Sequence, residues 1–371
     1  MDFRERKNKK RVRRARYDED KRLTMKILHT MAGGKAGGAE MAFVDLLIAQ
    51  KQAGMDIMAA CRTNVQRVPL LKAVGVPVFE FPFGGIFDFK TKSGLEKLIR
   101  DTRPHIVQCW MSRAAKLTPN PSKTLAFKKI ARLGGYYNLK YYKNVQHFIG
   151  NTPDICRWLI DDQKIPANHV SHINNFAELE PIKTPLTKAE FNTNTNSFVF
   201  LAMSRLHPAK AIDTALHALA KTPKAILWIA GEGPEEKKLK ILAQDLNIND
   251  RVKWLGWRTD RAALLDASDA VLFTSRFEPF GGTFAQSWAA KKPLVTTASQ
   301  GPMQYVTHGE NALVANIDDA DMLADLMLAL MQDHILYRKL ARQGYAAYQT
   351  QFKKKLVLKS YSDLYTFLMA T

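Results

Sequence analysis

Hydrophobic and polar positions along the chain predict strands and helices that alternate in two successive series. In the first series, short apolar runs are expected to form strands at 25–31, 55–61, 76–81, 105–110 and 170–176. Helices are expected between them at 41–53, 69–74, 94–101 and 154–161. The second series predicts strands at 198–203, 225–230, 251–257, 270–274 and 294–297, and helices at 212–220, 320–332, 335–349 and 353–370. Strands that alternate with helices are typical of parallel sheets covered by helices, so the chain is predicted to be an α/β protein.

Changes in composition predict where the domains begin and end. Residues 1–24 are highly charged and nearly devoid of apolar side chains, so they are expected to form a disordered tail; a basic arm on anionic lipid is the alternative. Residues 181–197 are rich in Pro, Thr and Asn and have no periodicity, as in a linker. The chain of 371 residues is long enough for two domains. We therefore expect one domain at 25–180, a second at 198–350, and a C-terminal helix at 351–371.

The net charge of +20 indicates an anionic partner, which could be nucleic acid, acidic lipid or a phosphorylated substrate. Charge alone does not choose among these. The three cysteines are widely spaced, which fits a reducing cytosol rather than a disulfide framework or a metal site. Neither a transmembrane run of 18 apolar residues nor a secretory signal is recognised, so the protein is expected on the cytoplasmic side.

Residues 123–148 mix Lys and Arg with four tyrosines and allow several interpretations. Interleaved aromatic and basic side chains could stack on nucleic-acid bases or lie at a membrane interface. The structural alternative is a helix, a Gly-Gly turn and a strand. The flanking pattern favours these elements together with a surface that faces an acceptor.

The stretch around which the chain is organised lies between the strand at 270–274 and a helix that ends before Pro293. The intervening loop carries Glu278, Phe280 and the pair Gly281-Gly282. A glycine loop that opens a helix leaves unpaired backbone N–H groups at the positive end of the helix dipole. Because glycine has no Cβ, an anion or a hydroxyl oxygen of a ligand can come close to this backbone.

Two cations follow the first strand of the second series. Arg205 and Lys210 lie in the loop 204–211, at the carboxyl end of the strand at 198–203. Ligands bind beyond the carboxyl ends of the strands in open α/β sheets. The two residues could form a solvated pair, but two cations placed there would also neutralise a departing diphosphate and make it a better leaving group. We favour binding of a phosphorylated donor.

These motifs resemble the retaining glycosyltransferases of family 4, whose two Rossmann-like domains form the GT-B fold. Glu278, Phe280, Gly281 and Lys292-Pro293 match the acidic motif of that family, which places a second glutamate eight residues after the first. This chain has Gln286 there. Three further segments of the second series match in family order: 204–211 (SRLHPAKA, with Ala211 in place of Gly), 231–234 (GEGP) and 308–314 (HGENALV). In the first series, 37–40 (GGAE) resembles the first glycine loop of the family.

The resemblance implies a set of site residues. Glu278, Arg205 and Lys210 are expected to be catalytic. The residues expected to bind the donor are Gly37, Gly38, Arg205, Lys210, Gly231, Trp257, Arg258, Glu278, Phe280, Gly281, Gly282 and Gln286. The family often has a histidine motif at the end of the strand at 105–110, but this chain has Gln108 and Trp110 in the equivalent places. Trp110, Ser112 and Arg113 are therefore expected on the acceptor side without a histidine base.

The resemblance also implies the reaction. The expected donor is a nucleoside diphosphate sugar carrying UDP or GDP, the anomeric configuration is retained, and neither metal nor cofactor takes part. The acceptor is expected to be lipid-linked or of the lipopolysaccharide type, at the inner face of the cytoplasmic membrane, where the enzyme would be peripheral. The aromatic stretch 79–89 is either a core strand with its exit turn or an apolar lip for that acceptor. Alternatives are a nucleotide-sugar epimerase or phosphorylase, a non-catalytic homologue on the same fold, and a nucleic-acid-binding protein.

Overall fold

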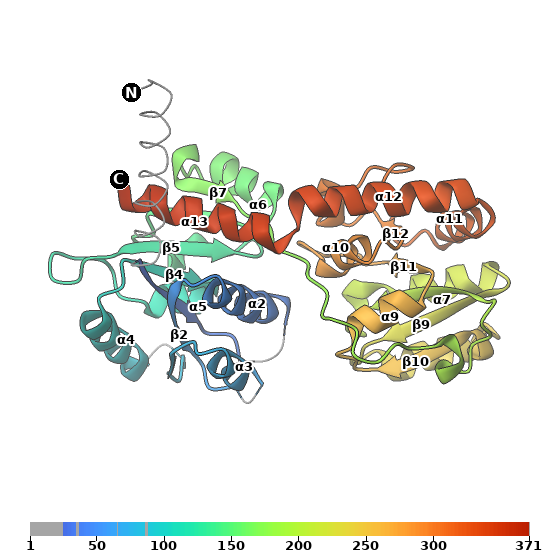
Figure 1. The fold of residues 1–371 in the computed structure, drawn as a ribbon, viewed down its shortest axis with the longest axis horizontal. Coiled ribbons are helices and arrows are strands. Elements are labelled where there is room, and N and C mark those ends of the chain that lie inside the picture. Colours follow the sequence, from blue (N-terminus) through green and yellow to red (C-terminus); the bar gives the residue numbers. More distant parts are fainter. Residues whose placement is uncertain (1–24, 35–36, 65, 86–87, 371) are drawn as a thin grey trace, which may run out of the picture. The chain divides into compact units, whose positions relative to one another are not determined.

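The computed structural model describes residues 25–34, 37–64, 66–85 and 88–370. The predicted tail at 1–24 lies outside the described residues. The chain forms two compact units (Figure 1). Unit 1 consists of the chain up to Asn174 together with Val357 onward, and unit 2 consists of Asn175–Leu356. Each unit is described by itself below.

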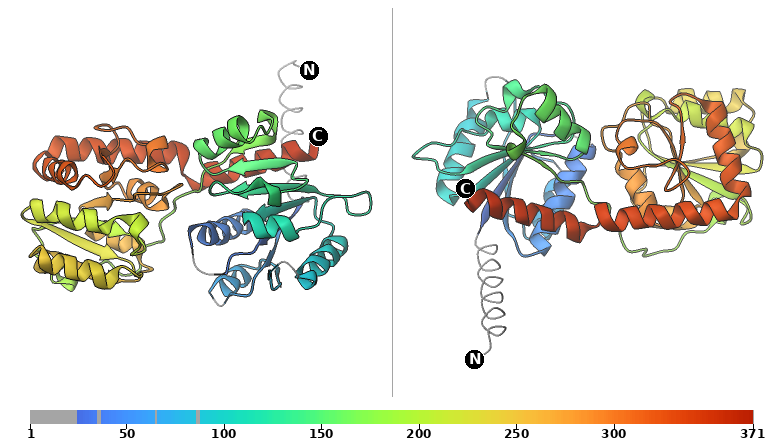
Figure 2. Two further views of the ribbon diagram at one scale, coloured as in Figure 1. Left: turned by 180° about the vertical axis from the view of Figure 1, so that it is seen from behind. Right: turned by 90° about the horizontal axis from the view of Figure 1, so that it is seen from above.

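Unit 1 is a sheet of seven parallel strands in the order β3-β2-β1-β4-β5-β6-β7. Its strands are β1 (Lys26–Met31), β2 (Asp56–Cys61), β3 (Val78–Glu80), β4 (Ile106–Trp110), β5 (Lys128–Leu133), β6 (His147–Gly150) and β7 (Val170–His172). Its main helices are α2 (Gly38–Gln52), α3 (Arg67–Ala73), α4 (Phe89–Thr102), α5 (Met111–Leu117), α6 (Pro153–Arg157) and, from Val357 onward, α13 (Lys354–Ala370). Helices lie on both faces of the sheet (Figure 2).

Unit 2 repeats this plan with six parallel strands in the order β10-β9-β8-β11-β12-β13. The strands are β8 (Phe198–Met203), β9 (Ala225–Ala230), β10 (Val252–Gly256), β11 (Ala270–Phe273), β12 (Leu294–Thr297) and β13 (Leu313–Ala315). The helices are α7 (Ile212–Lys221), α8 (Glu236–Asp245), α9 (Arg261–Ala267), α10 (Gly282–Ala289), α11 (Ala320–Gln332) and α12 (His334–Gln351). The predicted α/β class with two Rossmann-like parallel sheets is confirmed. No helix in the described part of the chain combines the length and apolarity needed to cross a membrane.

The helix expected at the start of 123–148 is wrong, because this segment contains strand β5. β5 lies between β4 and β6 and is therefore enclosed on both edges. Two of its residues, Lys129 and Arg132, are buried cations, which obscured the apolar pattern of a central strand. The Lys129 ammonium donates to the carbonyl of Thr118 (2.9 Å) and to Asn120 Oδ1 (3.1 Å), and the Arg132 guanidinium lies 4.4 Å from the ring centroid of Trp110. Each charge thus has partners inside the fold.

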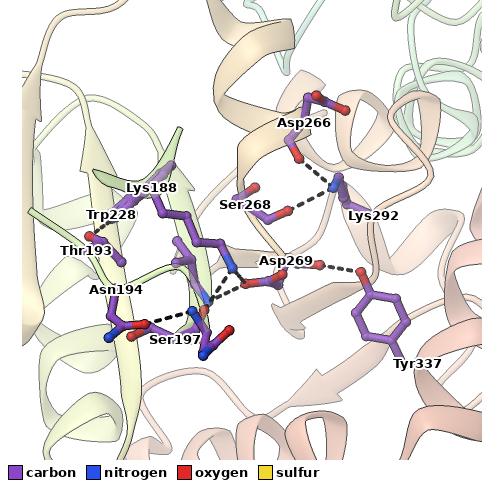
Figure 3. Close-up of polar contacts among 12 residues, drawn as sticks. Lys188, Thr193, Asn194, Ser197, Trp228, Asp266, Ser268, Asp269, Lys292 and Tyr337 are labelled. Atoms are coloured by element: carbon purple, nitrogen blue, oxygen red, sulfur yellow. Dashed lines mark hydrogen bonds and ion pairs between the residues drawn. The ribbon is translucent and has the colours of Figure 1, made fainter. Parts of the chain in front are cut away.

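The segment expected to be a linker, 181–197, belongs to unit 2, and the division between the units falls at Asn174 and Asn175. Figure 3 shows how the segment is held: Lys188 Nζ donates to Asp269 Oδ2 (2.7 Å), and Trp228 Nε1 donates to Thr193 Oγ1 (3.1 Å). Such contacts between residues distant in sequence cannot be read from a Pro-, Thr- and Asn-rich composition.

Lys292, which matches the Lys-Pro end of the central motif, has a structural role that Figure 3 shows. Its ammonium donates to the carbonyls of Asp266 (2.9 Å) and Ser268 (2.8 Å) at the end of α9. These carbonyls have no partner within the helix, and a cation there also interacts favourably with the helix dipole. Burial lowers the pKa of Lys292, although Asp266 and Asp269 oppose this effect.

Buried hydrogen bonds attach α13 to the rest of unit 1. Trp110 Nε1 donates to His29 Nδ1 (3.2 Å), so the neutral His29 ring carries its proton on Nε2. Burial lowers the pKa of His29 to about 3. Gln50 Nε2 donates to the Tyr365 hydroxyl (3.1 Å), which donates to Gln108 Oε1 (2.8 Å). One hydroxyl on α13 therefore joins α2 to β4.

We predict that Tyr365→Phe lowers the free energy of unfolding of unit 1 by about 1–3 kcal/mol, because the amides of Gln50 and Gln108 then lose a buried partner. Tyr141→Phe is the control, since the Tyr141 hydroxyl has no hydrogen bond to any residue that the structure describes. Urea unfolding of the full chain, with hydrogen–deuterium exchange to assign the transition of unit 1, measures both variants. Equal stabilities of the two variants would contradict the role of the Tyr365 hydroxyl.

Candidate functional site

The candidate site lies where β8, β9 and β11 of unit 2 end. These three strands are neighbours in a parallel sheet, so the loops at their carboxyl ends meet at one edge. The loops are 204–211 after β8, 231–235 after β9 and 274–281 after β11. The sequence motifs expected to bind a donor follow these same strands.

The first two loops fit together only because glycines stand at two positions. Gly231 has φ +155°, and a Cβ there would lie 1.9 Å from the carbonyl oxygen of Ser204. A Cβ at Gly233 would lie 2.2 Å from the carbonyl oxygen of Leu206. In return, Leu206 N donates to the carbonyl of Glu232 (2.9 Å). Gly231 thus supports the loop that carries Arg205, and its predicted contact with a donor stays a prediction.

Lys210 and Glu278 form an ion pair at this edge. Lys210 Nζ donates to Glu278 Oε2, although the two residues are 68 apart in sequence. Their side chains are 22% and 17% exposed, so solvent screens the pair only in part. Arg205 is exposed and makes no ion pair with any residue in the described ranges. The structure therefore brings two of the three expected catalytic residues together and leaves the third open to solvent.

The backbone after Glu278 turns sharply into α10. Gly281 has φ +81°, and a Cβ there would lie 2.7 Å from the ring of Phe273. Gly282 is exposed and begins α10, and a Cβ there would meet nothing within 4 Å. Phe280 is buried, in ring contact with Phe284 at a centroid distance of 5.7 Å. A ligand at this turn would therefore meet backbone groups, because the Phe280 side chain faces the core.

The residues expected near the nucleoside lie in different surroundings. Gln286 is half-buried on α10, and its side chain has no hydrogen bond to a described residue. Trp257 is 58% exposed, and its backbone N–H donates to Glu232 Oε1 (3.1 Å). Arg258 is engaged, since its Nε donates to Asp260 (2.9 Å). Gln286 and Trp257 are thus accessible for a ligand, whereas Arg258 would have to exchange a partner.

The candidate residues of unit 1 lie at the carboxyl ends of β1 and β4. Gly37 precedes α2 and Gly38 begins it. A Cβ at Gly37 would lie 2.7 Å from Glu40 Oε2, so the Glu40 carboxylate folds back onto this glycine loop. Residues 35–36 of the loop are outside the described ranges.

The three residues expected on the acceptor side differ in exposure. Trp110 is 1% exposed and packs in the core, so we do not carry it into the proposed site. The Ser112 hydroxyl lies 3.4 Å from that of Tyr142, and the exposed Arg113 donates to the carbonyl of Phe83 (3.2 Å). An alternation of polar and apolar residues could not show that Trp110 points inward, because both faces of this parallel sheet are covered.

Sequence reasoning missed Arg276 and Gly301, which hold the Glu278 loop. Gly301 N donates to the carbonyl of Glu278 (2.7 Å), and a Cβ at Gly301 would lie 2.6 Å from that oxygen. Arg276, two residues before Glu278, pairs with Asp213. A cation within the loop after the strand at 270–274 was a signal present in the sequence. Among the described residues, no group of three or more His, Cys, Asp or Glu could hold a metal ion.

Two parallel-sheet domains with charged glycine loops at the strand ends are features of the GT-B fold, and the comparisons with known proteins identify the family. Residues 184–347 match the family described as Glycosyl transferases group 1. The lipopolysaccharide core biosynthesis glycosyltransferase LpsD of Rhizobium meliloti is 30% identical over 350 residues, covering 92% of this chain and 98% of LpsD. LpsE of the same organism is 30% identical over 342 residues, with the same coverage of 92% and 98%.

A solved structure gives the same result for the fold. Anabaena HepE, crystallised in complex with UDP and glucose, superimposes with a TM-score of 0.78 at 21% identity, covering 92% of this chain and 99% of HepE. The chain belongs to the group 1 family of glycosyltransferases and has the GT-B fold.

We predict that Gly231→Ala destabilises unit 2 by about 2–4 kcal/mol, because it combines a disfavoured φ with a clash against the Ser204 carbonyl. Gly282→Ala is the matched control, since a methyl group there meets nothing. Urea unfolding measures both. If Gly231→Ala unfolds like Gly282→Ala, the close approach of the two loops does not exist in solution.

Proposed function

We propose that the protein is a retaining, family-4 type glycosyltransferase that moves a hexose from a nucleoside diphosphate sugar to an acceptor hydroxyl. The observation that carries the proposal is the Lys210–Glu278 ion pair at the carboxyl ends of β8 and β11, beside the glycine turn into α10. A cation and an acid at one edge of the sheet can bind the two parts of such a donor, the diphosphate and the sugar. Lys210 would bind the diphosphate and Glu278 the hydroxyls of the sugar.

The chemistry requires that charge be neutralised as the donor breaks. The bond between the anomeric carbon and the diphosphate oxygen breaks, and its electron pair stays with the leaving nucleoside diphosphate. Lys210 and Arg205 offset that negative charge. The acceptor hydroxyl attacks the anomeric carbon from the face the diphosphate leaves, so configuration is retained, and its proton passes to the departing phosphate oxygen. These residues can stabilise the charge without a metal ion.

Gln286 and Trp257 are proposed to contact the nucleoside. A glutamine amide can accept and donate hydrogen bonds with ribose hydroxyls, but it lacks the strength of an ionised acceptor. Compared with the glutamate that the family has at this position, Gln286 is therefore expected to reduce the affinity for the donor rather than the rate of the chemical step. We expect UDP or GDP as the nucleotide.

The proposed acceptor is a lipopolysaccharide core or another lipid-linked glycan at the inner face of the cytoplasmic membrane. The names of LpsD and LpsE place those relatives in lipopolysaccharide core synthesis. A net charge of +20 supports peripheral binding to anionic lipid. In the aromatic stretch 79–89, Phe83 is buried as a core residue is, whereas Phe89 is 73% exposed and is available to an apolar acceptor.

We predict that one of UDP, GDP, ADP and CMP raises the melting temperature of the wild type and that Lys210→Ala loses most of this shift. A ligand that binds only the native state stabilises it, and a lost charge-assisted hydrogen bond costs about 1.5–3 kcal/mol. Arg205→Ala should weaken the shift in the same direction. Lys221→Ala is the control, because Lys221 pairs with Asp321 between α7 and α11. Thermal unfolding at millimolar nucleotide measures all four proteins.

The alternatives give other results in the same set of experiments. If none of these nucleotides stabilises the wild type, the result counts against the proposed donor, and salt-dependent binding of RNA would then support a nucleic-acid-binding protein. If a nucleotide binds but no sugar is transferred to lipopolysaccharide core acceptors, an epimerase or a non-catalytic homologue is favoured. NMR of the anomeric proton in the product decides between retention and inversion.

A further inference from the structure

Arg276 joins the loop that carries Lys210 to the loop that carries Glu278. Its backbone N–H donates to the carbonyl of Ala209 (2.9 Å), and its guanidinium NH1 donates to the carbonyl of Pro208 (2.7 Å). The adjacent Phe277 N–H donates to the same Ala209 oxygen (3.3 Å). The main chain just before Lys210 is therefore bound to the main chain just before Glu278.

The rest of the Arg276 guanidinium is occupied by acids. NH1 and NH2 donate to the two carboxylate oxygens of Asp213 on α7 (3.1 and 2.7 Å). Nε forms an ion pair with Asp318 Oδ1 (2.6 Å), and this oxygen also accepts from the Thr214 hydroxyl (3.1 Å). The hydrogen bond from Arg276 and its charge hold the pKa of Asp213 below its ordinary value, against the opposing effect of burial.

This arrangement leaves the guanidinium little capacity for a ligand. Arginine has five N–H donors. Three are donated to Pro208 and Asp213 at 3.1 Å or less, Nε is in an ion pair with Asp318 (2.6 Å), and NH2 also lies 3.5 Å from the Thr214 hydroxyl. The two carboxylates outnumber the one cation, so the local charge does not attract a phosphate. Arg276 is thus unsuited to bind the diphosphate directly.

Neighbouring hydrogen bonds fix the two loops on either side of Arg276. The Thr274 hydroxyl donates to the carbonyl of Lys210 (2.9 Å). The buried Thr297 hydroxyl donates to the carbonyl of Ser275 (2.8 Å), which attaches the same loop to β12. The backbone positions of Lys210 and Glu278 are consequently set by one connected group of contacts.

We propose that Arg276 is a positioning residue that sets the distance between the Lys210 ammonium and the Glu278 carboxylate, so that a nucleoside diphosphate meets a preorganised Lys210. The inference rests on the proposed function for its ligand. Exposed ion pairs contribute little to stability, and the three side chains are 30%, 40% and 50% exposed. A bidentate pair that also binds a backbone carbonyl is better suited to fix geometry, which is what preorganised catalysis requires.

The first test needs no ligand. Hydrogen–deuterium exchange compares the wild type with Arg276→Ala, Arg276→Lys and the control Arg251→Ala. Arg251 also ties a helix end to a loop of unit 2, by donating to the carbonyls of Leu219 (2.9 Å) and Thr222 (2.8 Å), but at the amino end of β10. We expect faster exchange at 204–211 and 274–281 in Arg276→Ala but not in Arg251→Ala. The exchange of Arg276→Lys should lie between those of the wild type and Arg276→Ala.

The second test measures function through UDP and UMP, or GDP and GMP if the wild type binds guanine nucleotides. Calorimetry should show Arg276→Ala weakening the diphosphate about tenfold and the monophosphate by less than about twofold; tenfold corresponds to about 1.4 kcal/mol. In a Lys210→Ala background the further effect of Arg276→Ala should fall below about twofold, because both changes remove one contact.

Each outcome decides the matter. Unchanged exchange at 204–211 in Arg276→Ala overturns the proposal whether or not a nucleotide binds. Faster exchange with wild-type affinity for the diphosphate also overturns it, since Arg276 would then be structural only. If the wild type binds no nucleoside diphosphate, the proposed function fails, and the exchange result alone shows whether Arg276 fixes the two loops. Full additivity of Lys210→Ala and Arg276→Ala counts against the coupling.

Discussion

The parallel pairing of β8 with β9 on one side and β11 on the other is the constraint on which the site depends. Each pair aligns strands that are far apart in sequence, as in the register of Phe200 with Ala270. The loops after these strands must then lie at one edge of the sheet. There, backbone groups of neighbouring loops come into contact, which a side chain larger than that of glycine would prevent. Gly231 and Gly281 allow this, because both have φ values that other residues rarely adopt. The position of Lys210 beside Glu278 follows from the pairing and not from local sequence.

The sequence was sufficient to predict the features whose causes are local. β8 and β9 have the bounds that their apolar runs predicted, because parallel strands buried on both faces are nearly continuous in apolar residues. The loop glycines were also recognisable, since a strand, a glycine turn and a helix follow each other directly. The α/β class and two Rossmann-like domains follow from repetition of this unit.

Features that depend on distant partners could not be predicted. Lys129 and Arg132 disguised β5 because their buried partners, the Thr118 carbonyl and the Trp110 ring, come from elsewhere in the fold. Trp110 itself was assigned to the acceptor side because it stands where the family has its histidine motif, yet it packs inside. For Arg276 the sequence shows a cation, but it does not show that this cation pairs with Asp213, which lies 63 residues away. The periodicity of hydrophobic residues indicates which face of an element is apolar. It does not indicate which charged residues pair.

The ion pair between Lys210 and Glu278 joins the two loops at the site in the free protein. Lys210 and Glu278 hold each other in place and are partly shielded from solvent. A nucleoside diphosphate carries more negative charge than one carboxylate, so under the proposed function it is the stronger partner for Lys210. Binding would then release Glu278 to accept hydrogen bonds from the sugar. The exchange needs the two side chains at a fixed separation before the ligand arrives, because a loop that had to be ordered on binding would subtract that cost from affinity. This is the physical reason that the backbone contacts around Ala209 matter to a reaction in which Ala209 has no chemical part.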